Sequence, residues 1–168
     1  MIIRKTAMSD LDTVCDIYAG AREFMRKSGN PNQWKNTNPS REVIESDIIA
    51  GKSYVCIDSN KTVAVFYFCI ERDPTYGMIN GAWLNDEPYG VVHRIARTAG
   101  TDSAKTSEGS GIGAFCLNWC FEQCGNLRVD THRDNAPMQN RLKSLGFTYC
   151  GIIWLENGEE RLAYQKVL

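Results

Sequence analysis

The feature that most constrains this chain is a strand, a glycine-rich turn and a helix that follow one another between residues 89 and 124. Residues 89–96 are apolar and β-branched, as expected of a strand, and residues 114–124 form an apolar helical segment. Between them, residues 108–113 read Glu-Gly-Ser-Gly-Ile-Gly. Glycines let a ligand approach the backbone, and the free N–H groups of a helix's first turn attract an anion. The sequence therefore predicts an anion-binding site at this turn.

The glycine turn differs from the two best-known phosphate-binding motifs. No Lys-Ser/Thr pair follows its glycines, as a P-loop requires, and its G-x-G-x-G spacing departs from the dinucleotide fingerprint. A phosphate-bearing cofactor held by backbone amides fits the pattern. A flexible connector is the alternative interpretation of a lone glycine cluster.

Length, charge and cysteine spacing exclude several classes of protein. A chain of 168 residues suits a single domain spanning residues 1–168, and its net charge of -1 gives no reason to expect a nucleic acid or an anionic membrane as partner. No apolar run could span a bilayer and the N-terminus is too polar for a signal peptide, so we expect a cytoplasmic protein. The seven cysteines lack zinc-site spacing, so we expect reduced core cysteines and no metal.

The periodicity of apolar residues predicts one α/β or α+β domain. Helical spacing occurs in two segments before the first β-hairpin, and Asn157-Gly158 marks a second hairpin near the end. The segment 75–88 is predicted to be a long loop with at most a short strand. The expected order is β-α-α-β-β-β-α-β-α-β-β, with strands at 2–7, 53–58, 61–72, 89–96, 127–132, 147–155 and 160–166 and helices at 10–27, 41–50, 114–124 and 135–146.

Three residues on the strand after the glycine turn could take part in proton transfer. Arg128, Asp130 and His132 alternate with apolar or small residues and so lie on one face of that strand. A carboxylate and an imidazole beside an anion site suit proton transfer, whereas an Arg128–Asp130 ion pair is the structural alternative. Asn135 follows at the start of the next helix, where spacing alone favours a helix cap.

Four aromatic residues stand in or beside predicted loops. They are Trp34, Tyr76, Trp83 and Tyr89. Aromatic side chains in such positions can line an acceptor pocket, although core packing is their more common fate.

Taken together, these segments resemble the two acetyl-CoA motifs of the GNAT N-acetyltransferase superfamily. The resemblance rests on residues 92–96, on the glycine turn 108–113, and on the spacing of Asn135, Met138, Leu142, Gly146 and Phe147. The expected element order also matches that fold from end to end. The resemblance implies a central mixed, mostly antiparallel twisted sheet flanked by helices, and transfer of an acetyl group from acetyl-CoA to a primary amine by direct attack.

The resemblance also assigns roles to individual residues. The coenzyme would be held by the strand backbone, the glycine turn and the start of the following helix, through Ile95, Ala96, Arg97, Glu108, Gly109, Ser110, Gly111, Ile112, Gly113, Asn135 and Met138. The acceptor would enter near Trp34, with Tyr76, Trp83 and Tyr89 as further pocket residues. For the base we expect Asp130 or His132, with His93 and Glu71 as further candidates.

The chain departs from the family pattern at two important positions. Glu108 places a carboxylate where the family usually has Arg or Gln, and Leu142 stands where a tyrosine often serves as general acid. A non-catalytic acyl-CoA-binding module of the same fold is therefore the main alternative, and a nucleotide-binding α/β protein is a third. The acidic loop residues Asp73, Asp86 and Glu87 are compatible with a cationic amine but also with simple exposure. A small-molecule or peptide acceptor and a possible homodimer complete the expectations.

Overall fold

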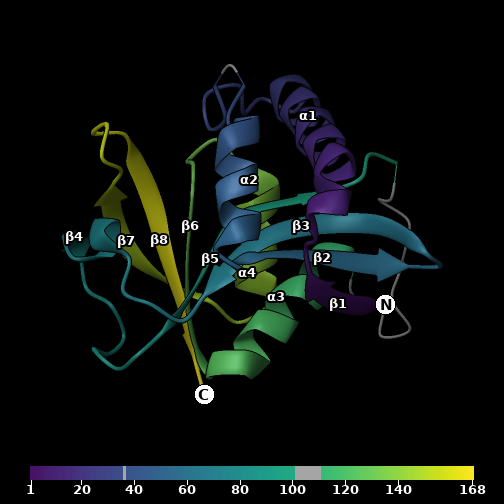
Figure 1. The fold of residues 1–168 in the computed structure, drawn as a ribbon. Helices are drawn as coiled ribbons and strands as arrows, with labels where there is room; N and C mark the ends of the chain where they lie inside the picture. Colours follow the sequence, from purple (N-terminus) through teal and green to yellow (C-terminus); the bar gives the residue numbers. More distant parts are fainter. Residues whose placement is uncertain (36, 101–110) are drawn as a thin grey trace.

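The computed structural model describes residues 1–35, 37–100 and 111–168 and shows a mixed α/β fold with one eight-stranded sheet. Four helices flank this sheet (Figure 1). The elements are β1 (Ile2–Lys5), α1 (Leu11–Lys27), α2 (Arg41–Ile49), β2 (Ser53–Asp58), β3 (Lys61–Cys69), β4 (Ile79–Gly81), β5 (Gly90–Arg97), α3 (Ile112–Cys124), β6 (Asn126–Thr131), α4 (Ala136–Ser144), β7 (Thr148–Trp154) and β8 (Glu160–Val167).

The strands lie in the order β1-β2-β3-β5-β6-β8-β7-β4. Only β5 and β6 are parallel neighbours among these strands, and every other neighbouring pair in the described sheet is antiparallel. The predicted fold class, a mixed and mostly antiparallel sheet flanked by helices, is confirmed. None of the helices in the described ranges is long and apolar enough to cross a membrane.

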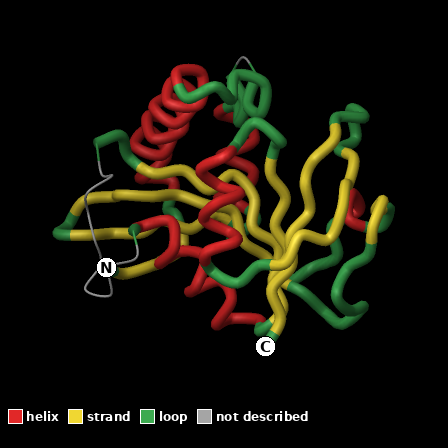
Figure 2. The backbone as a smooth tube through the Cα atoms, turned by 180° about the vertical axis from the view of Figure 1, so that it is seen from behind, coloured by secondary structure: helices red, strands yellow, loops and turns green. Residues whose placement is uncertain are grey.

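The helices cover both faces of the sheet, because alternate strand residues point to opposite sides. Helices α1 and α2 pack on one face against Val55, Val65 and Ala96. Helix α3 packs on the other face against Phe66 and Val92, together with residues of α4. Figure 2 shows this arrangement from behind, with helices on either side of the strands.

The predicted order differs from the observed one by a single short strand. β4 lies within the segment expected to be a long loop with at most a short strand, and it pairs with β7 at the edge of the sheet. Gly81 and Gly151 face each other in this pair, and a Cβ atom on Gly81 would stand only 2.1 Å from the carbonyl oxygen of Cys150. Glycine at both positions permits this close approach, and β4 itself has only three residues, one of them glycine, so it shows no alternating apolar pattern in the sequence.

Leu142 belongs to the core of this fold. Its side chain is fully buried among residues of α3 and the sheet, and it is not one of the residues that line the cavity described below. Leucine at this position, where the family often has a tyrosine, therefore makes an apolar packing contact between α4 and the sheet.

We expect Leu142→Ala to lower the free energy of unfolding by about 2–5 kcal/mol, because it leaves a cavity in a packed core. Urea denaturation followed by circular dichroism measures this change. Ile49→Ala removes a side chain of similar size that is exposed on α2, and it should change stability by less than about 0.5 kcal/mol. Equal effects of the two substitutions would contradict the assignment of Leu142 to the core.

Candidate functional site

The site is created where the two parallel strands separate. β5 and β6 pair only from Gly90 opposite Leu127 to Val92 opposite Val129. β5 then continues to Arg97 and β6 to Thr131 without pairing to each other in the described sheet. Beyond Val92, the edge of β5 that faces β6 therefore has no neighbouring strand among the described residues, and backbone groups on such an edge need other hydrogen-bond partners when they are shielded from water.

A bulge in β5 accompanies this separation. The pairing of β5 with β3 shifts register between Val65 and Tyr67, and Arg94 has a φ of 51°. Positive φ is rare for a residue with a side chain and marks a backbone held by its surroundings. The buried hydroxyl group of Tyr18 on α1 donates a hydrogen bond to the carbonyl oxygen of Arg94 at 2.9 Å. The contact fixes the turn of the strand beside the cavity.

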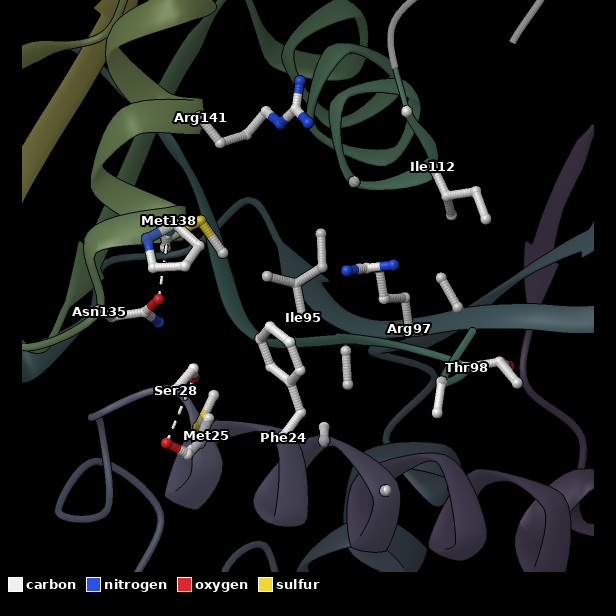
Figure 3. A pocket seen from close by; sticks show the side chains of 18 of the residues that line it. Phe24, Met25, Ser28, Ile95, Arg97, Thr98, Ile112, Asn135, Met138 and Arg141 are labelled. Carbon is white, nitrogen blue, oxygen red and sulfur yellow. Dashed lines mark hydrogen bonds between the residues drawn. The ribbon is translucent and has the colours of Figure 1, made fainter. Parts of the chain in front are cut away.

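A cavity of about 290 Å³ lies along β5, beyond the point at which β6 separates from it. It is bounded by α1 on one side and by the N-terminal ends of α3 and α4 on the other, with β5 between them (Figure 3). Eight residues predicted to bind the cofactor line this one cavity: Ile95, Ala96, Arg97, Gly111, Ile112, Gly113, Asn135 and Met138. Glu108, Gly109 and Ser110 lie outside the described residues.

The end of the cavity beside α3 is positively charged. Gly111 is the N-cap residue of α3, so the first N–H groups of the helix face this end. Nη2 of Arg141 lies beside Gly111, 3.7 Å from where a Cβ atom would stand. Burial and the positive charge of Arg141 both lower the pKa of Arg97. Figure 3 shows both guanidinium groups reaching into the cavity, an arrangement suited to a phosphorylated ligand.

Asn135 connects the cavity with the loop after α1. Its Oδ1 accepts a hydrogen bond from the N–H of Met138, so the predicted helix cap is confirmed. Its Nδ2 donates to Oε1 of Gln33 at 2.9 Å, and Gln33 also accepts from Asn30. The loop that carries Trp34 is therefore tied to the first turn of α4.

Beside the cavity, on the face that carries α1 and α2, His93 lies between two carboxylates. Nε2 of His93 is 2.7 Å from Oδ2 of Asp73, and Nδ1 is 3.5 Å from Oδ1 of Asp130. Tyr76 donates its hydroxyl hydrogen to the same Oδ1 of Asp130 at 2.7 Å. Thr75 completes the shell of Asp73 with its backbone N–H and its hydroxyl group.

The two carboxylates keep His93 protonated. Burial alone would lower the pKa of His93, but hydrogen bonds and charge interactions with Asp130 and Asp73 outweigh it and raise the pKa to about 9. Burial likewise opposes ionisation of Asp73, yet its bonds to His93 and Thr75 hold its pKa at about 2. The pKa of Asp130 is also lowered, against the effect of burial, by His93 and Tyr76. The cluster therefore carries a net charge of -1 near neutral pH.

The other two candidate bases lie in less suitable surroundings. Nδ1 of His132 accepts the N–H of Asp134, and burial together with the charge of Arg161 lowers the pKa of His132. The neutral ring then carries its proton on Nε2, and its one lone pair is already engaged. Glu71 is exposed and forms an ion pair with Lys52.

The predicted pocket aromatics are divided between two places. Trp34 packs edge-on against Tyr18 of α1, with ring centroids 5.6 Å apart. Tyr76 and Tyr89 are buried in a core cluster, and Trp83 packs against it. Trp83 and Tyr89 also hold the guanidinium of Arg128 against their rings, so Arg128 stacks on aromatic faces instead of pairing with Asp130. Pocket lining by Tyr76, Trp83 and Tyr89 stays a prediction.

Sequence reasoning missed several residues of this site. Phe24, Met25 and Ser28 of the α1 region line the cavity, as does Arg141. Arg141 stands three residues after Met138 on the same helix face, and this spacing is a signal that could have identified it. Asp73 was anticipated as an exposed or substrate-binding loop acid, and the structure places it mostly buried against His93.

We expect the ring of His93 to titrate with a midpoint near pH 9, because Asp130 and Asp73 outweigh its burial. We expect the ring of His132 to titrate below pH 6.5, because burial and the charge of Arg161 outweigh the effects of Asp134 and Glu159. The chain has two histidines, so ¹H–¹³C correlation spectra recorded across this pH range should show two ring signals. The spectrum of His132→Gln assigns them. Two midpoints near 6.5 would contradict the proposed protonation of His93.

Comparisons with known proteins agree with this architecture. An acetyltransferase of the GNAT family from Streptococcus agalactiae superposes with a TM-score of 0.86 at 30% identity, over 99% of this chain and 95% of that chain. A ribosomal-protein-alanine N-acetyltransferase from Brucella melitensis has a TM-score of 0.64 at 19% identity, over 100% of both chains.

A phosphinothricin acetyltransferase of the same superfamily from Sinorhizobium meliloti, solved in complex with AcCoA, has a TM-score of 0.64 at 15% identity. It matches 99% of this chain and 88% of its own. No protein-family model matches the sequence, and the search of curated proteins found no significant match. With 30% identity to a solved member along nearly its whole length, and with that member's sheet and helices, the chain belongs to the GNAT family of acetyltransferases.

Proposed function

We propose that this protein transfers an acetyl group from acetyl-CoA to a primary amine. The observation that carries the proposal is the cavity along β5 with its arginine-rich end at α3, and the Asp130–His93 cluster lies outside this cavity, beside the strand junction. The AcCoA-bound relative from Sinorhizobium meliloti supports acetyl-CoA as the donor. The fold family supports acyl transfer in general.

The residues of the cavity suit the parts of a coenzyme A thioester. Arg97, Arg141 and the first amides of α3 would bind its phosphate groups. The unpaired edge of β5 at Ile95 and Ala96 would bond the amide groups of the pantetheine arm, as an added strand would. Met138 would pack beside that arm, and the thioester would then lie near the point where β5 and β6 separate.

Asp130 is the group best placed to receive the acceptor ammonium. Its side chain is 10% exposed, Oδ1 is engaged by Tyr76, and no described residue donates a hydrogen bond to Oδ2. His93 is already protonated and His132 has its lone pair occupied, so neither competes for the proton. Of the two bases expected from the sequence, we therefore propose Asp130.

The proposed reaction is a direct displacement. The amine nitrogen attacks the thioester carbonyl, so that a C–N bond forms and the C–S bond breaks. The nitrogen loses two protons in the course of the reaction. One passes through Asp130 to solvent, and the other neutralises the coenzyme A thiolate. Leu142 is buried in the core and has no proton to give, so the second proton reaches the thiolate through water.

We expect Asp130→Asn to reduce kcat/KM by about 10²–10⁴-fold, the usual contribution of a general base, while leaving acetyl-CoA affinity unchanged. Release of free thiol over a panel of amines measures turnover, and thermal stabilisation by acetyl-CoA measures binding. His132→Gln is the matched variant and should keep kcat/KM within about threefold, since its lone pair serves Asp134. Full activity in Asp130→Asn would refute the assignment.

We expect Arg141→Ala to raise the Kd for acetyl-CoA about tenfold or more, because it removes a charged hydrogen-bond donor from a phosphate site. Lys143→Ala removes an exposed cation from the same helix outside the cavity, and it should leave the Kd unchanged. Calorimetric titration with acetyl-CoA measures both. Tight binding in every variant, with no thiol released from any amine, would favour the non-catalytic acyl-CoA-binding alternative.

A further inference from the structure

The face of the sheet beside the cavity carries two neighbouring groups of opposite net charge. The first is the cluster of Asp73, His93 and Asp130, where one imidazolium lies between two carboxylates and the net charge is -1. The charge of Arg161 also acts on Asp130, but no described residue donates a hydrogen bond to Oδ2 of Asp130. A cationic partner is therefore favoured at the open oxygen of Asp130.

The second group has a net charge of +1. Glu159 accepts from Lys35 at 2.7 Å and from Nη2 of Arg161 at 3.2 Å, so one carboxylate is shared by two cations. Arg161 is only 5% exposed. The same Nη2 reaches the carbonyl oxygen of Gln33 at 3.5 Å, the outer limit of a hydrogen bond. Nη1 of Arg161 donates to the carbonyl oxygen of Glu160 at 2.9 Å, so the long contact of Nη2 with Gln33 is the one that a carboxylate could replace.

The strand register places these groups side by side. Asp130 of β6 lies opposite Ala163 of β8, so Arg161 is the diagonal neighbour of Asp130 on the same face. Residues in this relation are about 7–8 Å apart, and their Cβ atoms are somewhat closer. Gln33 accepts the long contact from Arg161 through its carbonyl oxygen, and its side chain accepts a hydrogen bond from Asn135 at the rim of the cavity. Asp130 is therefore at the end nearer the strand junction, and Arg161 and Lys35 lie towards the β7–β8 turn.

We propose that the acceptor is a zwitterionic amine of the α-amino acid class, with its ammonium on Asp130 and its carboxylate on Arg161. The inference rests on the proposed acetyl transfer and specifies its substrate class. A small molecule with both charges spans the two groups with one charge-assisted hydrogen bond at each end. A polyamine, a lysine side chain or a peptide N-terminus supplies the ammonium without an adjacent carboxylate.

The test compares matched acceptors in a thiol-release assay with acetyl-CoA. The common L-α-amino acids are each assayed beside their carboxamide and their decarboxylated amine. We expect kcat/KM for the preferred amino acid to exceed that of both analogues at least tenfold, since charged hydrogen bonds to the carboxylate are lost in each. Equal or faster reaction of the analogues would overturn the substrate class while sustaining acetyl transfer. Failure of every amine would overturn both.

Substitutions locate the carboxylate site. Arg161→Gln should reduce the preference for the amino acid over its carboxamide to about one, and Lys35→Gln should reduce it about threefold. Lys35 is exposed, so its variant retains a folded protein if Arg161→Gln does not. Arg133→Gln is the control, because Arg133 is an exposed neighbour that pairs with Glu160 instead. An unchanged preference in Lys35→Gln and in any folded Arg161→Gln would refute the assignment.

Discussion

The structure depends on a pair of parallel strands that stay together for only three residues. β5 and β6 part after Val92 and Val129, and the bulge at Arg94 is held by the hydroxyl group of Tyr18. A strand edge left unpaired inside a protein needs other hydrogen-bond partners. An extended ligand can provide them as a further strand would. The cavity is thus a consequence of pairing that the sheet itself leaves incomplete.

The charged residues around the cavity form two groups, one of positive and one of negative net charge. The α3 end brings Arg97 and Arg141 together, and burial and then the charge of Arg141 lower the pKa of Arg97, so an anionic ligand would be favoured there. On the face that carries α1 and α2, the buried imidazolium of His93 lies between Asp73 and Asp130. Because His93 is already protonated, it holds Asp130 in place and cannot itself serve as a base. In the proposed reaction, charges of both signs orient the ligands, and one oxygen of Asp130 acts as the base.

Local sequence patterns predicted the long elements well because their signals are local. The helices α1 to α4 follow from apolar periodicity and from glycine or proline at their ends, and the fold class follows from their order. β4 was not assigned because it has only three residues, one of them glycine, and so shows no alternating pattern. The contact of Asp73 with His93 joins a loop to a strand twenty residues later, and no spacing rule reveals it. Arg128 likewise stacks on aromatic rings and does not pair with Asp130, because of packing in three dimensions that the sequence does not reveal.

One side chain belongs to both halves of the site. Asn135 uses its oxygen to begin α4 and its amide nitrogen to hold Gln33 of the acceptor-side loop. Serine, threonine and aspartate are equally good helix caps, but an ionised aspartate has no hydrogen to donate and the two hydroxyl side chains are shorter. Asparagine alone among the favoured caps can meet both demands at this separation. The identity of this residue is thereby fixed by two unrelated requirements, and a change that satisfies one of them still fails the other.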